Sequence, residues 1–158
     1  MASRKIYMHN RGFTLLETML VLALFAVVGS LALVMSHDAY HANTFYDERS
    51  RLVSVLQKAR SQAMSGVCLH DPCAGGEPHG VHIGDGVYVV FEGTRYDPID
   101  ATNESIEHAT ANVLVLGGTD VVFSPLAATA TPQTLTLSDA QHTSHIGIGS
   151  EGQITWDN

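Results

Sequence analysis

The chain has 158 residues and a mass of 17.0 kDa, which suits one ordinary domain and leaves too little sequence for two. Apolar residues make up 45% and charged residues 15%, below the globular norm of roughly 25%, and this composition excludes a disordered polyampholyte. The net charge of −8 predicts a poor general binder of nucleic acid, and two cysteines are too few for a disulfide scaffold.

A short basic leader opens the chain. Residues 1–12 contain Arg4, Lys5 and Arg11 and no acidic residue. From Phe13 onward, five basic residues stand against all 16 acidic ones, so a chain that begins there carries a net charge of −11. Positive charge before an apolar segment predicts that the N-terminus stays in the cytoplasm while the rest of the chain is exported.

Residues 13–35 form that apolar segment. Its polar side chains are those of Thr14, Glu17, Thr18 and Ser30. These 23 residues are enough for a helix that crosses a bilayer, which needs about 20. A cleaved secretory signal would have a shorter apolar core and a small-residue cleavage site after it, which residues 36–40 do not provide. A plain signal anchor fits the hydropathy equally well.

Glu17 argues against a plain anchor, because a carboxylate inside an apolar span is costly unless it is paired. Residues 11–17 read Arg-Gly-Phe-Thr-Leu-Leu-Glu, and with the following span they resemble the class III signal of type IV pilins and type II secretion pseudopilins. The resemblance implies that a prepilin peptidase cuts after Gly12 and that Phe13 becomes a methylated N-terminus. It also implies that Glu17 pairs with the N-terminal amine of a neighbouring subunit, which would make its burial tolerable.

The helix is expected to continue beyond the membrane as an amphipathic segment, residues 36–65. Five apolar residues recur there at helical spacing, namely Phe45, Leu52, Leu56, Ala59 and Ala63. Gly66 then provides a stop signal. This stripe is expected to form the core beneath a following sheet. Residues 51–63 also resemble the corresponding stretch of the GspH/FimT group of pseudopilins.

Residues 66–158 read as strands and turns and are expected to form an extracytoplasmic β-rich domain. We expect a hairpin of residues 81–83 and 87–91 and a second of residues 112–116 and 120–123. Further short strands are expected at residues 135–137, 146–148 and 153–156, and loops at residues 97–111 and 123–132. The predicted fold class is α+β: a long N-terminal helix packed on one small antiparallel sheet, which is also the pilin architecture.

Cys68 and Cys73 are the two cysteines, separated by four residues that include a proline. If the chain is exported as predicted, this segment lies where disulfides persist, and a Cys68–Cys73 disulfide is the favoured interpretation. A metal site with His70, His79 and His82 is the alternative, although the short paired spacings of zinc sites are missing. Two free thiols are the third possibility.

No catalytic motif, metal-ligand motif or phosphate-binding loop occurs in the sequence, so we expect neither an enzyme nor a cofactor. The leading hypothesis is a prepilin-like subunit, located in the inner membrane and then in a pilus or pseudopilus. Its partners would be prepilin peptidase and other pilin or pseudopilin subunits. The alternatives are a membrane-anchored extracytoplasmic enzyme or metal-binding module, and a DNA-uptake minor pilin, which the negative charge disfavours. The sequence does not distinguish between a major pilin, a minor pilin and a secretion pseudopilin.

Overall fold

The computed structural model describes residues 14–70, 75–110 and 113–157. The chain divides into two compact units, residues 1–40 and residues 41–158. Helix α1 (Leu15–Met64) provides the described part of the first unit, and its residues from His41 onward belong to the second. The C-terminal part of α1 therefore shares a compact unit with the β-structure.

The C-terminal half of α1 buries the predicted apolar stripe. Phe45, Leu52, Leu56, Ala59 and Ala63 are each at most 2% exposed. The helix ends where the sequence predicted, in a Schellman turn that satisfies its last carbonyls. In this turn Gly66 has a φ of 61° and donates its N–H to the Ala63 carbonyl at 3.2 Å, while the Val67 N–H donates to the Gln62 carbonyl, also at 3.2 Å.

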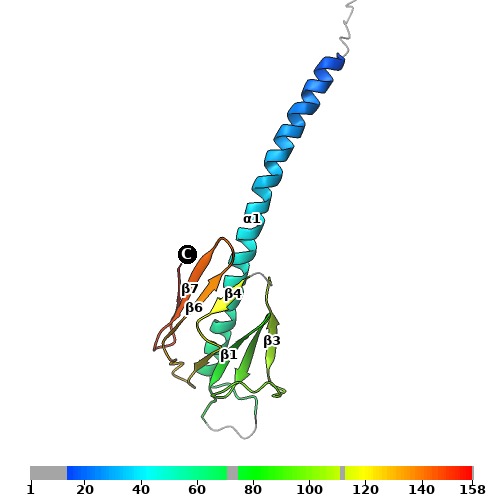
Figure 1. The fold of residues 1–158 in the computed structure, drawn as a ribbon. Coiled ribbons are helices and arrows are strands. Elements are labelled where there is room, and N and C mark those ends of the chain that lie inside the picture. Colours follow the sequence, from blue (N-terminus) through cyan, green and yellow to red (C-terminus); the bar gives the residue numbers. More distant parts are fainter. Residues whose placement is uncertain (1–13, 71–74, 111–112, 158) are drawn as a thin grey trace, which may run out of the picture. The chain divides into compact units, whose positions relative to one another are not determined.

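The first sheet contains β1 (His79–Gly84), β2 (Val87–Glu92), β3 (Glu104–Glu107) and β5 (Asp120–Phe123). Its strand order is β3-β2-β1-β5, and every neighbouring pair is antiparallel. The predicted first hairpin is confirmed as β1 and β2, in which Gly84 pairs with Val87 across the turn. Figure 1 shows β1 and β3 in green.

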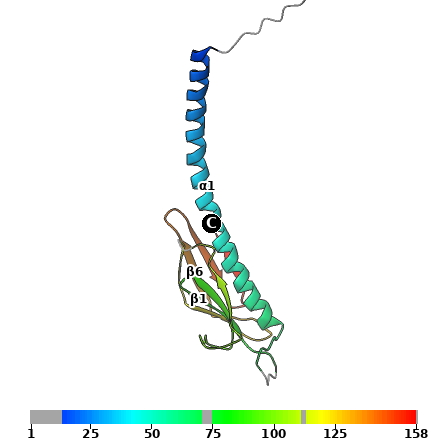
Figure 2. The ribbon, with the colours of Figure 1, turned by 90° about the vertical axis from the view of Figure 1, so that its right-hand side faces the viewer.

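The second sheet contains β4 (Leu114–Leu116), β6 (Gln133–Ser138), β7 (Thr143–Ile148) and β8 (Ile154–Trp156). The order is β4-β6-β7-β8, again with antiparallel pairs throughout. Figure 2 shows strands of both sheets on the same side of the C-terminal half of α1. One core joins the three elements, because Leu56 of α1, Val81 of β1 and Leu135 of β6 belong to a single buried cluster. The predicted α+β class is confirmed.

The prediction of one sheet was wrong, and so was the second hairpin. Strands β4 and β5 flank Gly117-Gly118-Thr119 as expected, but β4 pairs with β6 and β5 pairs with β1. The connection passes against β6: a Cβ on Gly117, whose φ is 117°, would meet the Thr134 carbonyl oxygen at 2.1 Å. The glycines therefore allow a crossing between sheets instead of a hairpin turn.

The predicted loop at residues 97–111 contains strand β3, which is a further correction. β3 reads Glu-Ser-Ile-Glu, and of its four residues only Ile106 is not exposed. It is an edge strand held to β2 by main-chain pairing, so its sequence carries almost no apolar signal. The strands predicted near residues 135–137, 146–148 and 153–156 are confirmed as β6, β7 and β8.

Candidate functional site

Helix α1 begins at a threonine cap. The Glu17 N–H donates to Thr14 Oγ1 at 3.2 Å, and the Thr18 N–H donates to the Thr14 carbonyl at 3.1 Å. A threonine followed three residues later by a glutamate is a helix-start signal, because the hydroxyl satisfies an N–H that has no partner inside the helix. The residues that resemble a pilin signal therefore also start this helix.

The Glu17 side chain is exposed in this single chain. Among the described residues, its carboxylate has no hydrogen bond or ion pair. It stands in a segment whose neighbours are almost all apolar, so any environment that covers the segment also removes water from this charge. The predicted pairing of Glu17 with the N-terminal amine of a neighbouring subunit stays a prediction.

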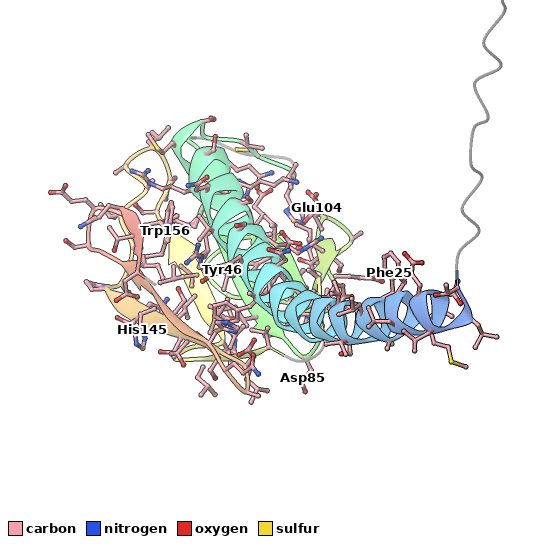
Figure 3. All side chains as sticks on the ribbon, turned by 90° about the horizontal axis from the view of Figure 1, so that it is seen from above. Phe25, Tyr46, Asp85, Glu104, His145 and Trp156 are labelled. Carbon is pink, nitrogen blue, oxygen red and sulfur yellow. The ribbon has the colours of Figure 1, made fainter. Side chains whose placement is uncertain are left out.

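An apolar helix surface extends from Leu15 to Val28. Nine of its side chains are 56–74% exposed: Leu15, Leu16, Met19, Leu20, Leu22, Leu24, Phe25, Val27 and Val28. They are distributed around the whole circumference of α1, and Phe25 is labelled among them in Figure 3. A helix that is apolar on every side is stable when lipid or other helices surround it.

The predicted cleavage and methylation residues, Gly12 and Phe13, lie outside the described residues, and both assignments stay predictions. Within the described part of the chain, no helix combines the length and the apolar character that a membrane crossing requires.

A buried carboxylate in the second unit was not anticipated from the sequence. Glu48 of α1 is 0% exposed and accepts three hydrogen bonds: from the Tyr88 hydroxyl at 2.6 Å, from the Ala109 N–H at 2.5 Å and from the Thr110 N–H at 3.2 Å. The Nδ1 atom of His108 lies 3.9 Å from Glu48 Oε1. Burial above all, and then the bond to Glu48, raise the pKa of the Tyr88 hydroxyl. The cluster joins α1 to β2 and to the segment after β3.

The sequence does contain a signal for this burial. Glu48 lies three residues after Phe45 and four before Leu52, which places it on the apolar stripe of the helix. A charged residue in that register predicts a polar partner inside the core, and Tyr88 of an apolar strand is a suitable donor.

The segment around Cys68 is held by polar contacts with the strands. His79 Nε2 lies 2.9 Å from the Val67 carbonyl oxygen, and the Leu69 N–H donates to Glu92 Oε2 at 2.6 Å. Cys68 is disulfide-bonded, whereas Cys73 lies outside the described residues, so the Cys68–Cys73 pairing stays a prediction.

The three histidines of the alternative metal site are engaged separately. His70 lies between Glu92 and Asp100, at 3.6 Å and 3.3 Å, and His82 Nδ1 lies 2.6 Å from Asp120 Oδ1. His79 faces a main-chain carbonyl instead. No group of three or more potential metal ligands occurs among the residues that the structure describes.

Comparison with known families gives a match to the N-terminal part of the chain. Residues 7–33 match the model of the prokaryotic N-terminal methylation motif. The chain carries the class III signal of type IV pilins and pseudopilins. This match contains Gly12, Phe13 and Glu17, and it identifies a prepilin-like, type IV pilin-type N-terminus that is typical of membrane-anchored exported proteins. No curated protein and no solved structure matches the chain.

Proposed function

We propose that this chain is a prepilin-like subunit that prepilin peptidase cleaves between Gly12 and Phe13, with methylation of the new N-terminal amine. The match to the methylation motif over residues 7–33 carries this proposal. Cleavage there would remove every basic residue of the leader and would leave a helix that starts at the Thr14 cap with Glu17 three residues later.

The mature subunit is proposed to assemble into a type IV pilus or a type II secretion pseudopilus through the N-terminal part of α1. The apolar helix surface at residues 15–28 would pack against the same surface of neighbouring subunits. Glu17 would accept the N-terminal amine of a neighbour, which compensates the loss of water around its carboxylate. The second unit would remain folded during assembly, because its core contains no residue of this surface.

Before assembly, we propose that the chain sits in the inner membrane with residues 13–35 as its single span. The basic leader would face the cytoplasm and residues 66–158 the other side. The proposed role is structural and not enzymatic. The net charge of −11 after Phe13 argues against the alternative of a DNA-uptake minor pilin.

The test is mass spectrometry of the full chain, expressed with and without a prepilin peptidase and extracted from membranes. The expected mature protein begins at Phe13 and carries one added methyl group. Gly12→Val should block processing, whereas Gly29→Ala should be processed normally, since a Cβ at Gly29 meets nothing within 4 Å. An N-terminus that remains at Met1 beside an active peptidase, or that lies beyond residue 30, contradicts the proposal.

A further inference from the structure

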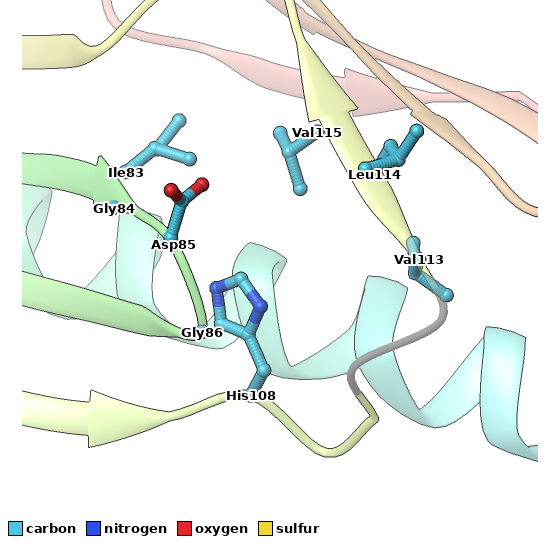
Figure 4. Close-up of a pocket in the computed structure, with 8 residues that line it drawn as sticks. All are labelled: Ile83, Gly84, Asp85, Gly86, His108, Val113, Leu114 and Val115. Carbon is cyan, nitrogen blue, oxygen red and sulfur yellow. The ribbon is translucent and has the colours of Figure 1, made fainter.

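A cavity of about 230 Å³ lies beside the turn between β1 and β2, in the second unit and outside the features used above. We call it the turn pocket. Its walls are Ile83, Gly84, Asp85, Gly86, His108, Val113, Leu114 and Val115 (Figure 4). The volume is below that of pockets for drug-sized molecules, so it suits a single small group.

Main-chain geometry fixes the turn that carries Asp85. Gly84 pairs with Val87, and Gly86 has a φ of 79°, which a glycine adopts without strain. The His108 N–H donates to the Gly86 carbonyl at 3.0 Å and extends the pairing between β2 and β3. The turn and the His108 backbone are therefore held together before any ligand arrives.

The His108 ring brings an unpaired nitrogen to this wall. Its side chain is 9% exposed, and Nε2 is buried without a hydrogen-bond partner among the described residues. On the other side of the ring, Nδ1 faces the Glu48 carboxylate at 3.9 Å. In the neutral tautomer whose proton is on Nδ1, toward this carboxylate, Nε2 presents a lone pair that requires a donor.

Asp85 adds a second acceptor at the rim. It is exposed, and its carboxylate has no partner among the described residues. Asp85 and His108 line the same pocket, and Figure 4 shows the Asp85 carboxylate pointing toward Ile83. The pocket thus has two hydrogen-bond acceptors, Asp85 and His108 Nε2, and no Lys or Arg among its lining residues. This combination favours a ligand that donates hydrogen bonds and carries a positive charge.

The remaining walls are suited to a hydrocarbon. Ile83 and Val113 are buried, Val115 is partly buried, and none of them carries a polar side-chain atom. Such walls would bury the methylene groups of a ligand whose charged end lies at Asp85. The net charge of −11 from Phe13 onward also raises the concentration of cations near the protein.

We propose that the turn pocket binds a primary alkylammonium group. The ammonium donates to the Asp85 carboxylate and to His108 Nε2, and the alkyl chain packs on Ile83, Val113 and Val115. The group can belong to a free small amine or to a lysine side chain of another protein, because both present the same chemistry.

The test uses the uniformly ¹⁵N-labelled full chain in detergent micelles near pH 7.5, where an alkylamine is protonated. The probe is n-butylammonium chloride, titrated against sodium chloride of equal ionic strength. We expect saturable amide shifts at Gly86, His108 and Val115, with a dissociation constant in the millimolar range for so small a ligand. Sodium butyrate should give no saturable shift, because Asp85 and Glu48 repel it.

Asp85→Asn is the decisive variant, since asparagine is well tolerated in turns and the fold should persist. It should weaken binding by about tenfold through the loss of one charged hydrogen bond. The matched control is Glu151→Gln, which removes one exposed negative charge from another turn and should leave binding unchanged. His108→Phe keeps an aromatic ring beside Tyr88 and should also weaken binding.

Two probes separate the sources of the amine. If Nα-acetyl-lysine-N-methylamide and n-butylammonium both saturate the pocket, it accepts a lysine side chain. If only n-butylammonium does, the ligand is a free small amine. Equal affinities for Asp85→Asn and Glu151→Gln, non-saturable shifts at all acidic residues, or saturable binding of butyrate would each overturn the proposal.

Discussion

The Tyr88 hydroxyl donates a 2.6 Å hydrogen bond to the Glu48 carboxylate, and both side chains are 0% exposed. A charge buried in this way is stable only while its partners remain, because no water can replace them. This pair links α1 to β2 inside the core, so it couples the helix to the first sheet.

Removing the hydroxyl should therefore destabilise the second unit. Tyr88→Phe keeps the ring but deprives Glu48 of a donor, and we expect the free energy of unfolding to fall by about 1–3 kcal/mol. Urea denaturation of the full chain, followed by circular dichroism, measures this. Tyr46→Phe is the control, because Tyr46 is 41% exposed and should tolerate the change. Equal losses in the two variants would contradict the role given to the bond.

The same pair predicts a loss of stability at alkaline pH. The pKa of Tyr88 is raised in the folded chain by burial and by Glu48, whereas an unfolded tyrosine ionises near pH 10. A raised pKa contributes stability that is complete below about pH 10 and is lost as the pH rises above it. The urea concentration at the midpoint of unfolding, measured from pH 8 to 11, should fall more steeply with pH for the native chain than for Tyr88→Phe. Parallel curves would exclude this contribution.

Glu17→Val should spare membrane insertion and folding but impair assembly. The change makes the apolar segment more apolar, and the described core of the second unit contains no residue of that segment. A neighbour's N-terminal amine would lose its partner, which leaves a buried cation at a cost of about 3–5 kcal/mol. Recovery in sheared filaments or cross-linked oligomers, normalised to the level in membranes, is the measurement.

Thr18→Val is the control for that experiment, since it also replaces a polar side chain near the start of α1. It should assemble normally. Equal oligomer recovery for Glu17→Val and Thr18→Val would show that Glu17 is merely tolerated, and loss of insertion by Glu17→Val alone would also contradict the argument.

Cys68 and Cys73 should resist alkylation until they are reduced. A thiol-reactive reagent added to the native, unreduced full chain should leave both cysteines unlabelled, and labelling should appear after reduction. Mass spectrometry of the labelled chain counts the modified thiols. Rapid labelling without a reductant would show that the thiols are free and that the predicted pairing is wrong.

The sequence predicts the helix better than the sheets because helix formation depends on local patterns, whereas strand pairing does not. Phe45, Leu52 and Leu56 recur at helical spacing on one buried face, and Gly66 ends the helix by its backbone freedom, so both are local signals. Strand pairing depends on residues far apart in the chain. Val121 of β5 pairs with Val81 of β1, and no local pattern distinguishes this partner from the nearer β4.

The candidate site divides in the same way. Glu17 belongs to a short motif with fixed spacing, so residues 11–17 suffice to single it out. The cluster of Glu48, Tyr88 and His108 and the pocket at Asp85 form only when the helix and the strands have packed together. Their residues are far apart in the sequence, so no local pattern predicts that they meet.

The position at which the second unit begins determines which recombinant fragments can be soluble. A fragment that starts at Gly66 would keep every strand but would lose Phe45, Leu52 and Leu56, and the inner faces of both sheets would be open to water. Such a fragment should aggregate through those faces. A fragment that starts at His41 would retain the helical half of the core while omitting the apolar helix surface at residues 15–28. Any truncation used for crystallisation or antibody production should therefore cut the chain inside α1 and not at its end.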